Sequence, residues 1–462
     1  MTTQRPAYWY TIAWVAALPL VALYLLWRAL RQSEYRRHWA ERFLGRGASG
    51  TVPADAVVIW VHAVSVGETR AARPLMERLA RAHPSACFVL THMTPTGRAA
   101  GTDIVRALPQ RVQQRYLPYD LPFAVRRFLR ETAPKVGVLM ETEVWPNLLY
   151  AARAHGIPVV LANARLSQRS LRKALRYGQF IRNAAACVQR VGAQSAADAA
   201  RIAQVFEGPV QVTGNLKFDL VPDPEQLEQG RRLRARLRAR LGNRPLWMFA
   251  STREGEERQI LAALQTAPPA TFARPCAQSP LLLFVPRHPQ RFAEVAGLLQ
   301  AAGATVLRRA QWESTLGALG DARSDEPASE PLARTVLLGD SMGEMPLFYA
   351  MADVALIGGS LQPLGGQNLI EACACGCPVV LGPHMFNFAQ AADDALQAGA
   401  AQCVQDAPSA LEAMQQICVQ ESRRQSMAQA ALAFAGAHRG ATERTVQLID
   451  EVLQGAISAV GR

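Results

Sequence analysis

Lysine and acidic residues are scarce in this chain, whereas arginine is abundant. Only three of the 50 basic residues are lysines, and the 37 acidic residues leave a formal net charge of +13. Such a balance suits a nucleic acid, an anionic membrane face or a phosphorylated substrate, and arginine favours phosphates and carboxylates. Aromatic residues make up only 7% of the chain and do not alternate with arginines, which argues against a stacking surface for nucleic acid.

The eight cysteines are too scattered for a disulfide framework, and this favours a reducing compartment. The run Cys373-Ala374-Cys375-Gly376-Cys377 leaves two interpretations, a metal site or buried free thiols. Its spacing is not that of a zinc site, and no histidine or further cysteine pair flanks it, so we expect free thiols. Because an Asp-x-Asp pair of the metal-binding type is also missing, the sequence predicts neither a metal nor a cofactor.

One stretch lacks charge altogether, from residue 8 to residue 27. As a helix it would cover about 30 Å, the thickness of a bilayer core, and it carries Trp and Tyr at both ends. Arg5 alone precedes it, and it is followed by Arg28, Arg31, Arg36, Arg37, Arg42 and Arg46. The positive-inside rule then places everything after residue 28 in the cytoplasm. A spanning helix and a shallow monotopic anchor both fit, whereas a cleaved signal peptide fits less well because no small-residue cleavage site follows.

The rest of the chain repeats one theme, an apolar run followed by a polar turn and an amphipathic helix. Apolar runs that predict strands lie at 57–64, 87–91, 136–140, 158–162 and 188–193, and again at 246–252, 281–285, 335–338, 354–357 and 379–381. Strands that alternate with helices predict doubly wound parallel sheets. We therefore expect an anchor at 1–30, one α/β domain at 31–235 and a second at 236–462, with a cleft between the two domains.

Two further stretches complete this division of the chain. Residues 223–244 are rich in Pro, Arg and Glu, and we interpret them as a linker with a solvated helix. Residues 312–334 are charged, rich in Ser and Ala and weakly periodic, which predicts a surface loop. The tail from about residue 409 has a helical pattern.

The first apolar run leads directly to a candidate catalytic acid. Ser65 and Gly67 end the predicted strand at 57–64, and a helical pattern begins at Glu68. Glu68 would then lie at the carboxyl end of a strand, where open α/β sheets hold their ligands. Two roles remain open for it: a general base, or a first-turn acid that complements the helix dipole.

Three turns of the second half follow successive predicted strands. They are Pro286-Arg287-His288-Pro289, the segment 339–344, and the glycine-rich segment 358–371. An arginine can grip a phosphate with two hydrogen bonds, paired glycines let backbone N–H groups approach one, and Glu371 could accept from both ribose hydroxyls. None of these turns is a GxGxxG fingerprint or a Walker loop. Each alone fits plain turn chemistry, but the three together favour a nucleotide site.

Ten motifs, in order, resemble the bacterial 3-deoxy-D-manno-octulosonic acid (Kdo) transferases, and the resemblance runs from the predicted anchor to about residue 400. These motifs are VHAVSVGET, THMTPTG, YLPYDLP, METEVWPNLL, LANARLS, VTGNLKFD, VPRHPQRF, GDSMGEMPLFYAMAD, GGSLQPLGGQNLIEA and GPHMFNF. The resemblance implies a GT-B fold, with two Rossmann-like domains, the acceptor side first and the nucleotide sugar second. It implies inverting transfer of Kdo from CMP-β-Kdo to the primary hydroxyl of the tetraacyl lipid A precursor, lipid IVA, in lipopolysaccharide biosynthesis.

The resemblance also implies roles for individual residues. Glu68 matches the general base, and Glu141 and Lys217 match positions that stabilise the transition state. The CMP-binding positions are matched by Pro286, Arg287, Met342, Gly343, Glu344, Asn368, Leu369, Ile370 and Glu371. The chain departs from the family in two places, since Leu369 stands where a proline is familiar and Gln367 replaces a histidine. Arg165 has two possible roles, pairing with the sugar carboxylate or forming a structural salt bridge.

The implied partners are CMP-Kdo, the lipid A precursor and the lipid surface of the inner membrane, with both α/β domains on its cytoplasmic side and no nucleic acid bound. The alternative within the same fold is a membrane-surface glycosyltransferase that uses a UDP sugar on a lipid acceptor. From another class, the basic charge also fits a non-catalytic membrane scaffold or a nucleic-acid binder, and a steep salt dependence of DNA binding would favour the latter.

Overall fold

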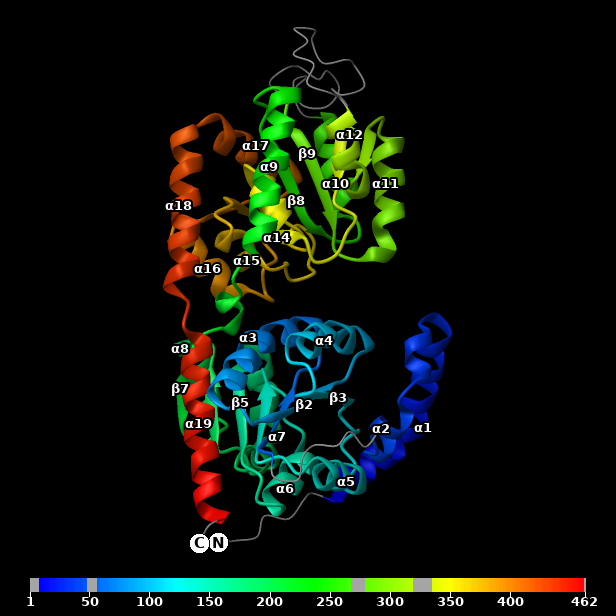
Figure 1. The fold of residues 1–462 in the computed structure, drawn as a ribbon, viewed down its shortest axis with the longest axis vertical. Coiled ribbons are helices and arrows are strands. Elements are labelled where there is room, and N and C mark those ends of the chain that lie inside the picture. The colour runs from blue at the N-terminus through cyan, green and yellow to red at the C-terminus, as the bar shows by residue number, and fades with distance from the viewer. Residues whose placement is uncertain (1–7, 48–55, 267–278, 319–334, 461–462) are drawn as a thin grey trace. The chain divides into compact units, whose positions relative to one another are not determined.

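The computed structural model describes residues 8–47, 56–266, 279–318 and 335–460 (Figure 1). The chain folds into two compact units. The first unit comprises Met1–Leu220 together with His438–Arg462, and the second comprises Val221–Ala437. This division differs from our prediction at two places. The predicted boundary at residue 235 lies inside helix α9 (Pro224–Leu241), and the C-terminal segment belongs to the first unit instead of the second.

The return of the C-terminal segment has a visible cause. The Asp219 carboxylate accepts hydrogen bonds from the backbone N–H groups of Gly440 and Thr442, at the start of helix α19 (Ala441–Val460). Ile449 and Leu453 on this helix are buried against the core of the first unit. The predicted helical tail is therefore confirmed, but its last helix packs on the sheet of the first unit.

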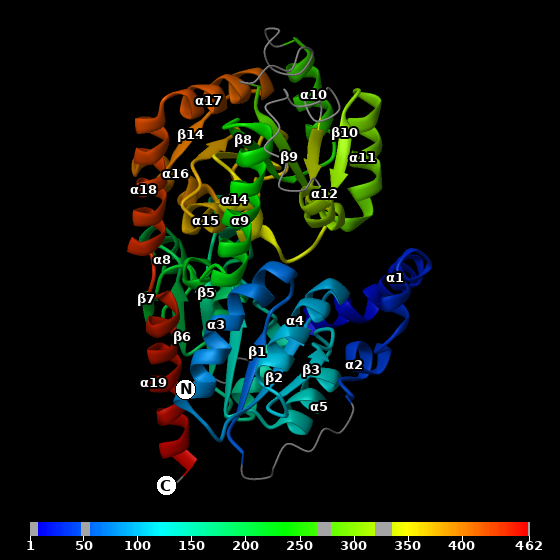
Figure 2. The same cartoon turned by 45° about the horizontal axis from the view of Figure 1, so that its top comes forward.

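The first unit contains a seven-stranded sheet in the order β3-β2-β1-β4-β5-β6-β7, and each neighbouring pair is parallel. Figure 2 shows β1, β2 and β3 side by side. The strands are β1 (Val58–His62), β2 (Cys87–His92), β3 (Val112–Tyr116), β4 (Val136–Met140), β5 (Val159–Ala164), β6 (Arg190–Ala193) and β7 (Val210–Val212). The five strands that we predicted are confirmed, whereas β3 and β7, at the two edges, were missed.

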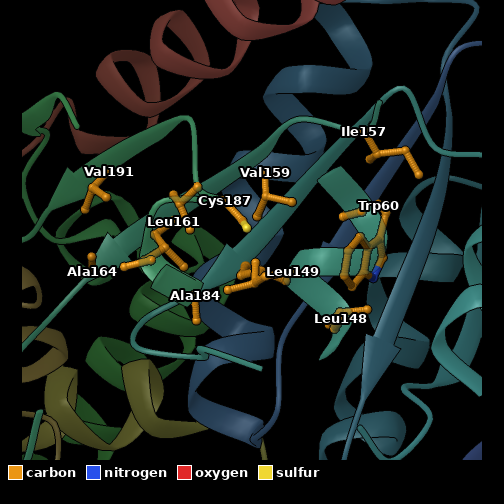
Figure 3. Packing of buried hydrophobic residues seen from close by; sticks show 14 of the residues in the cluster. Trp60, Leu148, Leu149, Ile157, Val159, Leu161, Ala164, Ala184, Cys187 and Val191 are labelled. Atoms are coloured by element: carbon orange, nitrogen blue, oxygen red, sulfur yellow. The ribbon is translucent and has the colours of Figure 1, made fainter. Parts of the chain in front are cut away.

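Helices cover both faces of this sheet. They are α3 (Val66–Ala82), α4 (Pro95–Ala107), α5 (Pro122–Thr132), α6 (Pro146–Ala154), α7 (Gln168–Ala185), α8 (Ala196–Ile202) and α19, with the short helix η2 (Leu216–Asp219). Successive residues of β1 point to opposite faces. Trp60 packs with residues of α5 and α6, as Figure 3 shows for Leu148 and Leu149. Ile59 packs with residues of α3, α4 and α19 on the other face.

The second unit is built on the same plan. Its seven parallel strands have the order β10-β11-β9-β8-β12-β13-β14. They are β8 (Leu246–Thr252), β9 (Leu281–Pro286), β10 (Thr305–Arg308), β11 (Thr335–Leu338), β12 (Val354–Ile357), β13 (Val379–Leu381) and β14 (Ala401–Cys403). The five predicted strands are again confirmed, and the two edge strands, β10 and β14, were again missed.

The helices of the second unit correct one prediction. They are α9, α10 (Glu256–Thr266), η3 (Pro289–Arg291), α11 (Phe292–Ala301), η4 (Arg309–Gln311), α12 (Trp312–Ala318), α14 (Met345–Met351), α15 (Leu369–Ala374), α16 (Ala389–Gln397), α17 (Ala407–Val419) and α18 (Glu421–Ala437). The loop predicted at 312–334 begins with α12, because Trp312 is buried, packs against Phe348 and donates to the Leu307 carbonyl. Residues 319–334 lie outside the described residues.

The first element of the described residues is the helix that we predicted for residues 8–27. Helix α1 (Tyr8–Arg31) is followed by η1 (Ser33–Arg36) and α2 (Trp39–Leu44), and all three belong to the first unit. Among the described residues, α1 is the one helix long and apolar enough to cross a membrane, with a mean hydropathy of 1.8.

Cys373, Cys375 and Cys377 are free thiols, as we expected, and burial raises the pKa of Cys373 to about 12.

Candidate active site

Glu68 lies where the sequence predicted, in the first turn after β1. Helix α3 starts two residues earlier than expected, with Ser65 as its N-cap. The Glu68 carboxylate accepts a hydrogen bond from the Val64 backbone N–H at 2.9 Å and another from the Ser65 hydroxyl at 2.8 Å. These two bonds hold the carboxylate over the strand-to-helix turn, with only 8% of the residue exposed.

The protonation of Glu68 is balanced near neutral pH. Burial raises its pKa most, the neighbouring Glu141 carboxylate raises it further, and Glu143 adds a smaller contribution. The hydrogen bonds from Val64 and Ser65 lower the pKa, and the result is a value of about 7. A carboxyl group with such a pKa can take a proton from a substrate and release it again at physiological pH. A surface acid that only complements a helix dipole would not have this property.

Glu141 and Lys217 meet within the same unit. Glu141 directly follows β4 and adopts a left-handed backbone conformation, with φ of 58°. Lys217 comes from η2, and its Nζ lies 3.5 Å from Oε1 of Glu141. Because the Glu141 carboxylate also acts on the pKa of Glu68, the structure brings together all three residues that we assigned to catalysis. The cluster thus combines an acid of near-neutral pKa with an ion pair.

Asn163 supports this cluster, and sequence reasoning did not select it. It is fully buried in β5, with φ of 54°, and its Oδ1 accepts from the Leu216 backbone N–H at 3.0 Å. That bond fixes the start of η2 and therefore the position of Lys217. Asn tolerates the left-handed conformation better than most residues, which is the signal that LANARLS contained. Arg165, two residues later, is half-buried at the end of the same strand.

A layer of neutral histidines lies beneath the Glu68 turn. His62 Nδ1 and Trp60 Nε1 both lie 2.9 Å from the Thr91 hydroxyl, and His92 Nδ1 lies 3.0 Å from the Ala63 carbonyl oxygen. Burial lowers the pKa of His62 to about 3 and that of His92 to about 4. Neither histidine can therefore compete with Glu68 as a group that titrates near neutral pH.

In the second unit, Arg287 and Gln367 join two of the predicted nucleotide-binding turns. Pro286 ends β9, and the Arg287 backbone N–H donates to the Thr252 carbonyl at 3.0 Å. The Arg287 Nε donates to Oε1 of Gln367 at 3.0 Å. Gln367 is the residue that replaces the family's histidine, and it precedes Asn368, the N-cap of α15. The turn after β9 and the glycine-rich turn after β12 are thus in direct contact.

The side chains of the last predicted segment divide into two groups. Asn368 Oδ1 accepts from the Ile370 backbone N–H at 3.2 Å, and Glu371 lies in the first turn of α15. Leu369 and Ile370 are buried, with at most 1% exposed. Their side chains therefore belong to the core of the unit, whereas Asn368 and Glu371, like Gln367 before them, are polar.

The remaining predicted segment follows β11, which pairs with β9. Met342 is half-exposed and Gly343 has φ of 86°, a conformation that favours glycine. The Glu344 carboxylate accepts two hydrogen bonds from Arg309, at 3.1 and 2.9 Å. Because neighbouring parallel strands end at one edge of a sheet, Met342, Gly343 and Glu344 lie at the same edge as Arg287.

Glu256 is a second residue that sequence reasoning missed. Its buried carboxylate accepts from the backbone N–H groups of Gly359, Leu361 and Arg253, at 2.6, 3.1 and 2.9 Å. It therefore fixes the shape of the glycine-rich turn. Gly358 is required there, because a Cβ atom at this position would lie 2.4 Å from the Ser251 carbonyl oxygen. The sequence offered no signal for Glu256, since an acid at a helix start is common.

Comparison with known proteins gives these two clusters a context. A family model described as 3-deoxy-D-manno-octulosonic-acid transferase (kdotransferase) matches residues 37–220. A 3-deoxy-D-manno-octulosonic acid transferase of Bordetella pertussis is 46% identical over 447 residues, which cover 96% of this chain and 99% of the relative. The Haemophilus influenzae protein of the same name is 33% identical over 456 residues, covering 97% and 99% of the two chains.

The similar solved structures support the fold of this chain, but not its activity. A glycosyltransferase from Rickettsia africae matches 87% of this chain and 99% of its own, with a TM-score of 0.54 at 11% identity. Anabaena Alr3699/HepE, solved in complex with UDP and glucose, matches 86% of this chain and 100% of its own, with a TM-score of 0.53 at 16% identity. The resemblance that the motifs indicated is confirmed: this chain belongs to the 3-deoxy-D-manno-octulosonic acid (Kdo) transferase family, and it is a glycosyltransferase of the GT-B fold.

Proposed function

We propose that this protein transfers Kdo from CMP-β-Kdo to the primary hydroxyl of the tetraacyl lipid A precursor, lipid IVA, with inversion at the anomeric carbon. The observation that carries the proposal is Glu68, a buried carboxyl group with a pKa of about 7 beside Glu141 and Lys217. A primary alcohol has a pKa far above 7, so its attack on a sugar needs a base that removes the proton.

The reaction is a single displacement. The acceptor oxygen forms a bond to the anomeric carbon of Kdo while Glu68 takes the hydroxyl proton. The bond from that carbon to the phosphate oxygen breaks at the same time, and CMP leaves with the electron pair. Lys217 supplies a positive charge for the negative charge that develops, and Glu141 holds the ammonium group in place through the 3.5 Å contact. This chemistry needs no metal, and the absence of a cofactor stays a prediction.

The second unit supplies groups suited to a nucleotide sugar. The guanidinium of Arg287 can pair with the phosphate of CMP, while Glu371 and Asn368 offer polar atoms to the ribose. Gln367 keeps Arg287 beside this turn through the 3.0 Å bond, and it can do so as well as a histidine would. We therefore expect the departures at Gln367 and Leu369 to leave donor binding intact.

The location of the enzyme follows from its acceptor. Lipid A precursors carry phosphates and stay in the bilayer, so we propose that the protein works at the cytoplasmic face of the inner membrane. The apolar helix α1 and the arginines after it suit such a surface, because anionic lipids attract basic segments.

A reconstitution experiment tests the proposed reaction. The purified chain is incubated with CMP-Kdo and lipid IVA, and mass spectrometry of the lipid should show a mass increase of one or more Kdo units. In parallel, CMP should raise the melting temperature of the protein and UDP should not, because a ligand stabilises only the state that binds it. A melting shift with UDP alone, together with an unmodified lipid, would favour the alternative of a UDP-sugar transferase.

Arg287→Ala should weaken donor binding. Because the variant loses a charge-assisted bond to the phosphate, we expect the dissociation constant for CMP to rise about tenfold or more, measured by calorimetry. Arg232→Ala is the matched control, since Arg232 is exposed on α9 and forms an ion pair with Glu228 on the same helix. Equal CMP affinities in both variants would remove Arg287 from the donor site.

A further inference from the structure

We infer that helix α1 lies in the plane of the membrane surface, docked along its length on the first unit, and does not cross the bilayer. The inference rests on the membrane association proposed above and deepens it. A helix of 24 residues is about 36 Å long. If it crossed the bilayer, only the end next to η1 could touch a domain that remains in the cytoplasm. The contacts of α1 therefore decide between the two orientations.

The N-terminal half of α1 is docked on the first unit. The Tyr10 hydroxyl donates to Oδ2 of Asp120 at 3.0 Å, and the Thr11 hydroxyl donates to Oδ1 of Asn147 at 3.3 Å. The Trp14 ring lies 5.8 Å from the Tyr119 ring and 6.3 Å from the Trp145 ring, measured between centroids. Both polar and aromatic contacts thus occur at the end of the helix farthest from η1.

The C-terminal half is docked as well. Leu25 and Ala29 are buried, with 2% and 5% exposed, in a cluster that includes Tyr35 and Tyr119, and Val21 packs against the same cluster. Residues 10, 14, 21, 25 and 29 follow the spacing of one helix face. A single stripe of α1 therefore contacts the protein from its first turns to its last.

The partner of Tyr10 cannot sit in a bilayer. Asp120 is 1% exposed and also accepts from the backbone N–H groups of Asn147 and Leu148, at 3.0 and 2.8 Å. These bonds tie it to the start of α6, inside the folded unit. If α1 crossed the membrane, its docked end would carry this part of the unit into or beyond the hydrocarbon, where polar groups and irregular backbone are costly.

The opposite face of α1 is apolar and suits lipid. The large hydrophobic side chains exposed there include Ile12, Val15, Leu20, Leu23, Tyr24, Leu26, Trp27 and Leu30. Arg31, Arg36 and Arg37 are exposed just beyond this face, and arginines at that position suit anionic headgroups. Figures 1 and 2 both show α1 at the edge of the first unit. An interfacial helix with one protein face and one lipid face accounts for all of these contacts.

This orientation would bring the lipid surface to the catalytic turn. Trp145 and Asn147, which contact α1, belong to the segment that begins with Glu141. Trp145 Nε1 also donates to the Glu143 carboxylate at 2.8 Å. Trp145 therefore contacts α1 and also bonds to Glu143, an acid that raises the pKa of Glu68. An acceptor that remains in the bilayer would meet the active-site turn at the height of its headgroups.

Topology mapping of the full chain tests the inference. The chain receives a protease-cleavable tag before Tyr8 and a second tag after Arg462. In inside-out inner-membrane vesicles, protease should remove both tags, and in intact spheroplasts it should remove neither. Cleavage of the N-terminal tag only in spheroplasts would show a spanning helix and overturn the inference, while leaving the proposed membrane association intact. Recovery of the chain in the soluble fraction would overturn both.

Depth measurements give a second readout. An environment-sensitive fluorophore is placed in turn at residues 12, 20 and 30, which are exposed along the lipid face of α1, in vesicles that contain anionic lipid. Lipids brominated near the headgroup should quench all three labels to a similar degree. A label at Val419, which is exposed on the second unit, is the control and should not be quenched. Quenching of the label at residue 20 by lipids brominated deep in the acyl chain, with the labels at 12 and 30 quenched only near the headgroup, would contradict the inference.

Discussion

Glu68→Gln should lower kcat for Kdo transfer by about a thousandfold and leave the dissociation constant for CMP unchanged. The expected loss is that of a general base, which contributes about 10²–10⁴ in rate. The glutamine oxygen can still accept from the Val64 N–H, and its amide can donate to the Ser65 hydroxyl, so the turn held by these two bonds should persist. Steady-state kinetics at saturating acceptor, with calorimetry of CMP binding, measures both quantities.

A matched variant on the same helix separates chemistry from folding. Glu77 lies on α3 in an exposed ion pair with Arg73, and Glu77→Gln should retain wild-type turnover. If Glu68→Gln also retained most of its turnover, Glu68 would be reduced to a residue that caps the helix. If CMP binding were lost together with turnover, the variant would have disturbed more than the base.

Lys217→Met should lower kcat by about 10²–10³, because it removes a cation placed for the charge that develops as CMP leaves. Methionine keeps much of the length and apolar stem of lysine, so η2 should remain folded around the Asn163 bond to Leu216. The loss should appear in kcat more than in KM for the donor, since the cation acts on the transition state. Rapid-quench measurement of a single turnover would isolate this step.

Lys173→Met is the control, because Lys173 is exposed on α7. It is one of only three lysines in the chain, with Lys135 and Lys217. Its rate should equal that of the unmodified chain. A Lys217→Met variant with normal kcat would restrict Lys217 to neutralising Glu141. A variant in which KM alone rises would assign Lys217 to ground-state binding of the donor.

The central strands could be predicted because burial on both faces requires continuous apolar runs. Edge strands are not under that constraint. β3 reads Val-Gln-Gln-Arg-Tyr and β14 reads Ala-Gln-Cys, so neither has an apolar pattern that a sequence can reveal. Helix α12 is a similar case, since one buried side chain, Trp312, stabilises a segment whose composition resembles a loop.

The division into units depended on contacts between distant parts of the chain. An amphipathic helix such as α19 needs an apolar surface to cover, but its own residues do not specify which sheet provides it. Asp219 contributes to the choice, because its carboxylate accepts hydrogen bonds from the backbone at the start of α19, more than 200 residues along the chain. In the sequence, Asp219 was only the last residue of the motif VTGNLKFD.

The candidate site shows the same limit. The position of Glu68 followed from a strand, a turn and a helix that are local in sequence. The motifs assigned Glu141 and Lys217 through the family resemblance, but their contact joins residues from β4 and η2. Asn163 and Glu256 act through backbone N–H groups of other segments. Such support depends on where the chain folds back, and a motif does not encode it.

The pH dependence of kcat/KM tests the central claim most directly, because a base must be ionised to act and kcat/KM reports the pKa of the free enzyme. The pKa of Glu68 is raised to about 7, so the carboxylate is lost as the pH falls through 7. We expect kcat/KM to be constant above about pH 8 and to fall about tenfold for each pH unit below 7, while the small residual rate of Glu68→Gln lacks this transition. A wild-type profile without a transition near 7, or the same transition in Glu68→Gln, would contradict the account.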